Sequence, residues 1–481
     1  MIFHCIVLDT MSFLNAGSKT IIVLGDVMLD VQIHGEIEKM ANEAPIPVLN
    51  KREVRMNLGG CGNVLMNLRA LGSKRLFLVS MVGEDIGAQE IRKELEGSPE
   101  ITPILISGPK YCTTVKTRGF ANNKIIFRYD HEMRRELSVE HAGEVIEAVT
   151  KILDSEKVDS IILSDYNKGF LGKELSQSVI SLANAKNIPV LVDPKVDYKR
   201  YIGCTLFKPN IKEIRDIFGI TYNSKNIQEI HRAIREQVKC RETVLTLSEE
   251  GITLLSESGE FIHERTHSTE VADVTGAGDI VISVLAYFYG TMPSRELIRL
   301  ATWMGTHSVK FMGTYVIRPG DLLEANREIS GSKYVARDHL DDLKGPLVVT
   351  NGCFDIVHEG HIALFKHCRT LVPPGGSLVV ALNGDESIRR LKGPTRPINS
   401  LAARVALLSQ FAMIDWVVVF DEDTPYELYR AMRPTIIVKG GDYTADSVVG
   451  AEFCDHVEIF EYLEGKSTTK IIERIAAKDA R

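Results

Sequence analysis

Short apolar runs rich in Val, Ile and Leu alternate with amphipathic stretches along most of this sequence. The runs occupy residues 20–24, 160–163, 189–192, 243–247, 347–350, 377–382, 416–420 and 435–438. Helical periodicity lies between several of them, for instance at 140–155, 175–187 and 401–411. Strands that are apolar on both faces and alternate with helices form parallel sheets covered on both sides. The pattern predicts an α/β fold.

The length of the chain predicts more than one domain. A chain of 481 residues exceeds what one hydrophobic core usually serves. Residues 326–345 are polar and charged, and they contain the helix breakers Gly331 and Gly345-Pro346. We therefore predict a first domain over residues 1–325, a linker over 326–345 and a second domain over 346–481.

Charge and cysteine usage exclude several classes of protein. The net charge of −7 argues against a nucleic-acid-binding protein, which normally has a basic face. The eight cysteines form no C-x-x-C pair, which is typical of reduced thiols. No apolar run approaches the ~18 residues of a membrane span. Residues 1–18 lack the features of a secretory signal, and we interpret them as an extension. We expect a cytoplasmic protein that binds neither nucleic acid nor membranes.

One region departs from the α/β pattern. Residues 111–120 and 124–129 alternate polar and apolar side chains around the turn Ala121-Asn122-Asn123, which predicts an antiparallel hairpin. Such a hairpin can be a lid over a site or a plain edge hairpin. Its Arg118 and Arg128 can clamp a substrate phosphate or form ordinary surface pairs.

The strongest local signal in the first domain is Asp273-Val274-Thr275-Gly276-Ala277-Gly278-Asp279, which precedes an apolar stretch. A glycine-rich turn that opens a helix binds anions, because its backbone N–H groups are unpaired and the helix dipole favours negative charge. A carboxylate in the first helical turn can take a proton from an attacking hydroxyl, so Asp279 is our candidate general base.

This motif resembles the carboxy-terminal signature of the ribokinase-like (PfkB) carbohydrate kinases, and further motifs match in the same order. The resemblance implies a three-layer α/β domain with a small β lid, and ATP as phosphate donor. It implies substrate binding by Asp26, Asp30, Gly59, Gly60, Asn63 and Lys195. It implies nucleotide binding by Asn210, Ile211, Lys212, Glu213, Ser248, Gly251, Thr275, Gly276, Ala277 and Gly278, with Glu213 holding Mg²⁺ through water.

Several of these residues also have structural explanations. Asp26 and Asp30 can cap strand ends, and Lys195 can be a solvated surface lysine. The spacing of Asn210 and Glu213 is that of a helix capping box. These alternatives stay open at the level of the sequence.

In the second domain, Thr350-Asn351-Gly352-Cys353-Phe354-Asp355 and His358-Glu359-Gly360-His361 join an apolar run to a helical stretch. Two histidines at a helix start can bind a triphosphate and stabilise charge on the phosphate that is transferred. A metal site is the rival interpretation, but no third ligand follows at a familiar spacing.

H-x-G-H resembles the signature of the cytidylyltransferase-like nucleotidyltransferases, which have a Rossmann-like domain. The resemblance makes His358 and His361 catalytic. We assign nucleotide binding to Phe354, Lys392, Arg404, Ser467, Thr468 and Thr469, the last three opening the final helix.

In this order, the two halves resemble the family of bifunctional heptose 7-phosphate kinase/heptose 1-phosphate adenylyltransferases. The resemblance implies phosphorylation at C1, adenylyl transfer from ATP to heptose 1-phosphate, Mg²⁺, and a role in lipopolysaccharide core synthesis. We also expect a homodimer. The alternatives are another sugar kinase fused to a CTP-using cytidylyltransferase, or a binding or regulatory protein whose site is catalytically inactive.

Overall fold

The computed structural model describes residues 19–122, 124–266, 270–318, 320–441 and 444–461. Contacts divide the chain into two compact units, one over Ala16–Arg318 and one that includes Pro319–Arg481. Each unit has a sheet and a core of its own, as the alternating pattern predicts. No helix in the described ranges combines the length and the apolar character that a membrane crossing requires.

The first unit is built on a nine-stranded sheet in the order β13-β12-β11-β10-β9-β8-β1-β4-β5. The strands are β1 (Thr20–Gly25), β4 (Arg75–Val82), β5 (Ile101–Ser107), β8 (Ser160–Ser164), β9 (Val190–Asp193), β10 (Leu206–Phe207), β11 (Glu242–Thr246), β12 (Ile252–Leu255) and β13 (Phe261–Glu264). Strands β11 to β5 in this order are parallel, whereas β12 and β13 are antiparallel additions.

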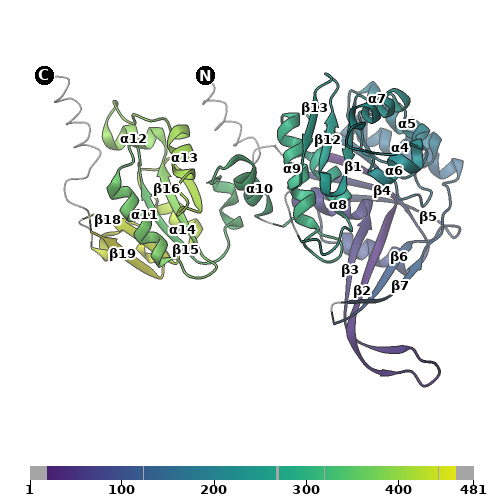
Figure 1. The fold of residues 1–481 in the computed structure, drawn as a ribbon, viewed down its shortest axis with the longest axis horizontal. Coiled ribbons are helices and arrows are strands. Elements are labelled where there is room, and N and C mark those ends of the chain that lie inside the picture. Colours follow the sequence, from purple (N-terminus) through teal and green to yellow (C-terminus); the bar gives the residue numbers. More distant parts are fainter. Residues whose placement is uncertain (1–18, 123, 267–269, 319, 442–443, 462–481) are drawn as a thin grey trace. The chain divides into compact units, whose positions relative to one another are not determined.

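Helices cover both faces of this sheet (Figure 1). Ile22 and Leu24 of β1 pack in one core with α4 (Val139–Ser155), α5 (Lys173–Ala185) and α7 (Ile227–Val238). Elsewhere α8 (Ala277–Phe288) packs against β8, β9, α2 (Cys61–Ala70) and α9 (Ser294–Ser308). The unit also contains α3 (Ile86–Leu95), α6 (Ile211–Phe218), η1 (Tyr198–Tyr201) and η2 (Ser248–Glu250).

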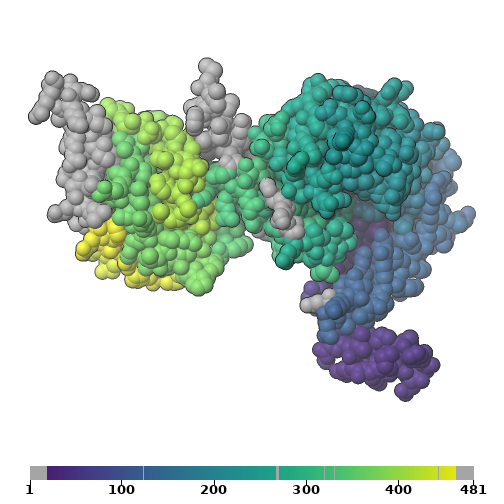
Figure 2. All heavy atoms as spheres, in the orientation of Figure 1, coloured from purple at the N-terminus to yellow at the C-terminus, as the bar shows by residue number. Residues whose placement is uncertain are grey.

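A second sheet of four strands, which we call the lid, leaves the body of the first unit (Figures 1 and 2). Its order is β3-β2-β6-β7, with β2 (Val27–Met40), β3 (Pro47–Gly60), β6 (Thr114–Ala121) and β7 (Lys124–His131). The predicted hairpin is confirmed as the antiparallel pair β6–β7. The long pair β2–β3 was not predicted, although it supplies half of the lid.

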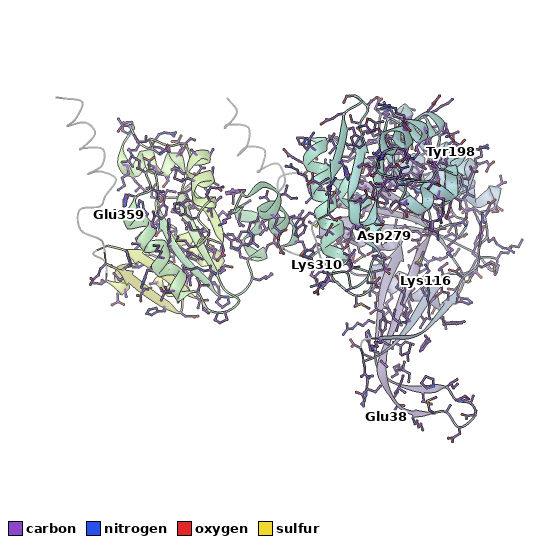
Figure 3. All side chains as sticks on the ribbon, in the orientation of Figure 1. Glu38, Lys116, Tyr198, Asp279, Lys310 and Glu359 are labelled. Carbon is purple, nitrogen blue, oxygen red and sulfur yellow. The ribbon has the colours of Figure 1, made fainter. Side chains whose placement is uncertain are left out.

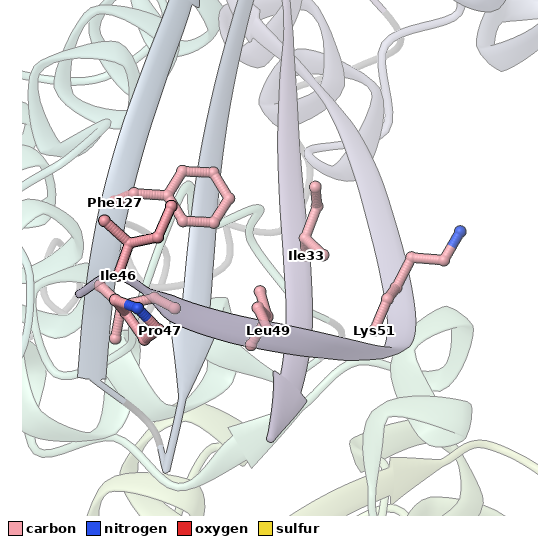
Figure 4. Close-up of a pocket in the computed structure, with 7 residues that line it drawn as sticks. Ile33, Ile46, Pro47, Leu49, Lys51 and Phe127 are labelled. Atoms are coloured by element: carbon pink, nitrogen blue, oxygen red, sulfur yellow. The ribbon is translucent and has the colours of Figure 1, made fainter. Parts of the chain in front are cut away.

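The two faces of the lid differ in character. Register places Asp30, Lys116 and Asp130 side by side on one face, and Val31, Met56, Thr117 and Tyr129 on the other. The second face leaves Val54, Met56, Phe127 and Tyr129 substantially exposed. Where the β2–β3 turn curls back, it encloses an apolar hollow of about 520 Å³ (Figure 4). The hollow is lined by Ile33, Ile46, Pro47, Leu49, Lys51, Ile126 and Phe127.

The second unit is a parallel sheet of six strands in the order β14-β17-β16-β15-β18-β19. The strands are β14 (Tyr334–Val335), β15 (Leu347–Gly352), β16 (Ser377–Asn383), β17 (Trp416–Phe420), β18 (Ile436–Gly440) and β19 (His456–Phe460). Its helices are α10 (Asp321–Ser330), α11 (Glu359–Leu371), α12 (Asp385–Lys392), α13 (Leu401–Ser409), α14 (Tyr426–Met432), η3 (Arg337–Asp342), η4 (Ala445–Ser447) and η5 (Ala451–Phe453). The chain order reverses between β15 and β18, and ligands bind at such switch points of open α/β sheets.

The boundary between the units differs from the predicted one. Residues 326–345, expected to be a linker, contain the end of α10, all of η3 and the edge strand β14. Val335 and Leu340 are buried in a core of the second unit together with Leu323. Residues 326–345 are mostly polar, and this composition predicted a linker although Val335 and Leu340 pack into the core of the second unit.

Candidate active sites

The glycine-rich turn of the first unit opens α8, as its sequence predicts. Asp273 organises the turn: its Oδ1 accepts hydrogen bonds from the backbone N and the Oγ1 of Thr275, at 2.9 and 2.7 Å. Its Oδ2 accepts from the backbone N of Gly313 at 3.0 Å. Gly276 is the N-cap, with φ of 83°, and Ala277 begins the helix. The N–H groups at this helix start have the arrangement that binds phosphate.

Asp279 lies in the first turn of α8 and is buried. Its Oδ2 accepts a hydrogen bond from Nδ2 of Asn63 at 2.9 Å, and its Oδ1 accepts one from the hydroxyl of Tyr166. Burial raises the pKa of Asp279, while the hydrogen bonds from Tyr166 and Asn63 and the charge of Lys208 oppose the rise. A raised pKa makes the carboxylate a stronger base, which suits proton abstraction.

A buried ion pair lies directly beside the turn. Nζ of Lys208 contacts Oδ1 of Asp193 at 2.9 Å, and both side chains are largely withdrawn from solvent. A Cβ placed on Gly278 would lie 3.7 Å from this Nζ and 3.8 Å from Oδ2 of Asp193. Burial raises the pKa of Asp193, and the charge of Lys208 opposes the rise. The sequence did not single out Lys208, although a lysine directly after the buried strand β10 was a usable signal.

The capping box expected as one explanation of Asn210 and Glu213 is present. The backbone N of Glu213 donates to Oδ1 of Asn210, and the backbone N of Asn210 donates to Oε2 of Glu213, each at 2.9 Å. Ile211 and Lys212 form the first turn of α6 between them. The other oxygen of Glu213, Oε1, accepts from Nζ of Lys195 at 3.1 Å. Lys195 therefore joins this cluster rather than standing alone in solvent.

The two aspartates expected to hold sugar hydroxyls have different surroundings. The carboxylate of Asp26 accepts hydrogen bonds from the backbone N of Tyr166, Lys168 and Phe170, at 2.9, 3.1 and 3.2 Å. Burial, and then the charge of Asp165, raises the pKa of Asp26 to about 6. These contacts favour the structural explanation, in which Asp26 holds the loop after β8.

Asp30 instead belongs to the lid. Its Oδ1 pairs with Nη1 of Arg118 at 3.1 Å. A Cβ on Gly59 would lie only 2.6 Å from its Oδ2, so glycine is required for this close approach. Gly60, with φ of 60°, is the N-cap of α2, the helix that carries Asn63. The structure thus brings Asp30, Gly59 and Asn63 to the same end of the unit.

The predicted nucleotide loop contains η2. Ser248 has φ of 54° and Gly251 has φ of 93°. The carbonyl of Gly251 accepts from the backbone N of Leu247 at 2.8 Å, which closes the loop. The loop is joined to the capping-box segment by a bridge between Thr246 and Asn210.

In the second unit, His358 is the N-cap of α11 and His361 lies in its first turn. Their rings stack with centroids 3.7 Å apart. The backbone N of His358 donates to Nδ1 of His361 at 3.4 Å. Burial, and then the charge of His358, lowers the pKa of His361 to about 4, so this ring is neutral at pH 7. A neutral ring that accepts at Nδ1 carries its proton on Nε2, which is therefore a donor.

Phe354 supports this histidine. Its ring meets the ring of His361 edge to face, with centroids 5.0 Å apart, and it also packs on Phe365. Its φ of 43° is unusual for a residue with a side chain, and such backbone strain concentrates at functional sites.

Arg404 and Lys392, expected to contact phosphate, lie in different environments. Arg404 is fully buried and donates to the carbonyls of Asn399, Cys353 and Asn383 and to Oδ1 of Asp385. Its guanidinium is used to hold strand ends together, which favours a structural role. Lys392 is exposed at the end of α12. Burial raises the pKa of the Cys353 thiol, and the nearby charge of Lys392 opposes the rise.

Two further residues near this site fix its loops and strands. Asp355 accepts from Nε of Arg396 at 2.6 Å and from the backbone N of Ile398 and Asn399, so it fixes the loop before α13. Nζ of Lys439 donates to Oδ1 of Asn351 at 2.8 Å, joining β18 to β15 at the switch point. Ser467, Thr468 and Thr469 lie outside the described residues.

Comparison with known families agrees with this division. Residues 18–319 match the family model for pfkB family carbohydrate kinases, and residues 349–474 match the cytidylyltransferase-like family. Among solved structures, phosphofructokinase-2 from Escherichia coli in complex with potassium covers 65% of this chain and 100% of its own. Its TM-score is 0.53 at 16% identity, which shows a shared fold. A putative sugar kinase from Clostridium perfringens gives a TM-score of 0.51 at 16% identity, covering 65% of this chain and 95% of its own.

Curated relatives match along nearly the whole chain. The bifunctional protein HldE of Syntrophotalea carbinolica is 39% identical over 471 residues, covering 94% of this chain and 95% of that protein. HldE of Geobacter sulfurreducens is 36% identical, covering 96% of this chain and 97% of the relative. HldE of Helicobacter pylori (strain Shi470) is also 36% identical, covering 95% and 98%.

Proposed function

The chain belongs to the family of bifunctional HldE proteins, with a pfkB-type carbohydrate kinase joined to a nucleotidyltransferase, and we propose heptose phosphates as its substrates. The kinase transfers the γ-phosphate of ATP to C1 of D-glycero-β-D-manno-heptose 7-phosphate. After a separate phosphatase removes the 7-phosphate, the second unit joins heptose 1-phosphate to AMP from ATP. The product is ADP-heptose for the lipopolysaccharide core, and the by-product is pyrophosphate.

The buried Asp279 beside the turn of residues 275–278 supports the kinase step most directly. The anomeric hydroxyl gives its proton to Asp279 as its oxygen bonds to the γ-phosphorus, and ADP leaves. The N–H groups at the start of α8 and the ammonium of Lys208 neutralise the phosphates. Asn63 and Tyr166 hold the carboxylate in place through their hydrogen bonds.

The stacked pair His358 and His361 supports the transferase step. The neutral His361 offers Nε2–H to the α-phosphate, while the start of α11 favours its negative charge. The sugar 1-phosphate oxygen attacks the α-phosphorus, and pyrophosphate leaves on the opposite side. We retain the nucleotide roles of Lys392, Ser467, Thr468 and Thr469 as part of this proposal.

Mg²⁺ fits the first unit as a partner of ATP. No group of three or more His, Cys, Asp or Glu in the described ranges forms a metal cage. Mg²⁺ keeps several waters and prefers phosphates with one or two carboxylates. Glu213 and Asp193, both near the phosphate turn, would hold it through water. A direct contact is less suited to Glu213, because both of its carboxylate oxygens already accept hydrogen bonds, one from Lys195 and one from Asn210. Bound Mg²⁺ would supply charge neutralisation between the β- and γ-phosphates.

We also propose a homodimer in the cytoplasm, joined through the lid. The apolar face with Val54, Met56, Phe127 and Tyr129 is exposed in the single chain, and large apolar patches usually mark interfaces. The neighbouring hollow lined by Ile33 and Phe127 can receive a side chain of a second copy (Figure 4).

One assay tests the two reactions. The purified protein is incubated with Mg²⁺, a panel of sugar phosphates and either ATP or CTP, and the products are identified by mass. We expect heptose 1,7-bisphosphate from the 7-phosphate, and ADP-heptose with pyrophosphate from the 1-phosphate. Pyrophosphate release with CTP but not with ATP would support instead the cytidylyltransferase alternative, which the HldE relatives do not favour.

A further inference from the structure

The face of the lid that carries Asp30 also carries a group of basic side chains. Lys116 and Arg118 alternate along β6, and Arg128 of β7 lies opposite Arg118. Lys168, in the loop after β8, is close enough for its charge to act on Lys116. Four cations therefore gather where the lid meets the body of the first unit.

Three of these cations have carboxylate partners. Arg118 pairs with Asp30 at 3.1 Å, Arg128 with Asp130 at 2.7 Å and Lys168 with Glu132 at 2.6 Å. Lys116 has no ion-pair partner in the part of the chain that the structure describes, although its side chain is only partly exposed. Burial lowers the pKa of Lys116; the charge of Asp30 opposes this, and Lys168 and Arg128 add to it. An ammonium withdrawn from water and flanked by cations is stabilised by an anion.

The position of Lys116 relative to the general base is defined by one tyrosine. Nζ of Lys116 lies 6.0 Å from the centre of the Tyr166 ring, and the hydroxyl of Tyr166 donates to Asp279. Figure 3 shows Lys116 on the lid, beyond the part of the site that holds Asp279. Tyr166 therefore lies between the general base and Lys116, so a substrate that extends from Asp279 along this tyrosine reaches Lys116 with its far end.

We propose that Lys116 binds the phosphate that the sugar acceptor already carries, so that the lid selects sugar phosphates over free sugars. The inference rests on the proposed function, because it requires an acceptor with a phosphate remote from the reacting hydroxyl. Asp30, held by Arg118, takes sugar hydroxyls between the two ends. A dianionic phosphate supplies the negative partner for the ammonium of Lys116, and a neutral hydroxyl cannot.

The test compares each sugar with and without its phosphate in the Lys116→Met variant. Met keeps the unbranched shape of the side chain, one atom shorter, and removes the charge. We expect the KM for the sugar phosphate to rise roughly tenfold or more, as for loss of a charge-assisted contact. The KM for ATP and turnover of the free sugar stay as in the wild type, and this turnover also shows that the variant is folded. Inorganic phosphate should compete with the sugar phosphate in the wild type and less in the variant.

Two matched variants complete the experiment. Lys116→Arg keeps the charge and should stay within a few-fold of the wild type, whereas Lys124→Met, at the far end of the same hairpin, should change nothing. Equal loss on both forms of the sugar, or no loss in Lys116→Met, overturns the inference. A wild type that phosphorylates free sugars as efficiently as their phosphates also overturns it. If the wild type uses a phosphate of another sugar, the heptose assignment fails, and the same comparison still tests Lys116.

Discussion

The hydroxyl of Tyr166 donates a hydrogen bond to Oδ1 of Asp279, joining the loop after β8 to the first turn of α8. The two residues are 113 positions apart in the chain. They meet because β8 lies beside β1 and β9 in the sheet, and α8 packs across β8 and β9. The pair fixes the direction of the carboxylate, and it sets how readily that carboxylate takes a proton.

Replacing Tyr166 with Phe removes this hydrogen bond, which holds the pKa of Asp279 down. The pKa of Asp279 then rises further, so the acid limb of the kinase pH profile moves to higher pH. We expect kcat at pH 7 to fall roughly tenfold, with little change in the KM for ATP. A pH profile of kcat that keeps its acid limb in place would contradict this coupling.

The two activities should be lost independently. Asp279→Asn removes the proton acceptor and should lower sugar phosphorylation by roughly 10²-fold or more, with adenylyl transfer unchanged. His361→Ala should lower pyrophosphate release by about 10²–10³-fold and leave the kinase intact. Both reactions are followed in the same preparation, so each variant is the control for the other. Loss of both activities in a folded variant would show that the sites depend on each other.

The apolar face of the lid makes a prediction about assembly. Phe127→Asp places a charge among exposed apolar side chains, and the proposed dimer should dissociate to monomers. Light scattering coupled to size exclusion measures the mass, with Lys151→Ala on the exposed surface of α4 as control. A wild-type protein that is monomeric at micromolar concentration excludes this interface.

His231 makes a prediction about acid stability. It is fully buried between Thr243 and Thr253, and burial lowers its pKa to about 3. In the unfolded chain, His231 takes up a proton with a pKa near 6.5, whereas in the folded chain it stays neutral at this pH. The free energy of unfolding therefore falls as the pH drops below 6.5. The loss amounts to about 2 kcal/mol by pH 5.

The measurement is the free energy of unfolding of the first unit against pH in the wild type and in His231→Gln. Gln cannot take up this proton, so its profile should be flatter between pH 6.5 and 5. Other groups titrate in the same range, Asp26 among them with the opposite sign, and the difference between the two proteins removes their contribution. Parallel profiles would refute the assignment.

The sequence predicted the parts of this protein that depend on local patterns. The parallel strands follow from apolar runs, and the turn of residues 275–278 and the histidine pair follow from glycines at helix starts. Tyr166 and Lys208 were not assigned to the site, although each closely follows the end of a buried strand, because their contacts with Asp279 and Gly278 depend on the order of the strands in the sheet. Asp26 was assigned to the substrate by resemblance and Arg404 to the nucleotide from a basic cluster, but groups within the protein already bind both side chains. The sequence does not show which groups lie opposite a side chain. The β2–β3 pair was missed because its outer half is polar and its alternation weak.

Successive residues of β6 lie on opposite faces of the lid, with Lys116 on the face of Asp30 and Thr117 on the apolar face. Inserting or deleting a single residue before this point would rotate every following side chain by half a turn. The lysine would then face away from the sugar, and Thr117 would take its place. Lengthening of this strand in relatives should therefore occur in pairs of residues or at its tip.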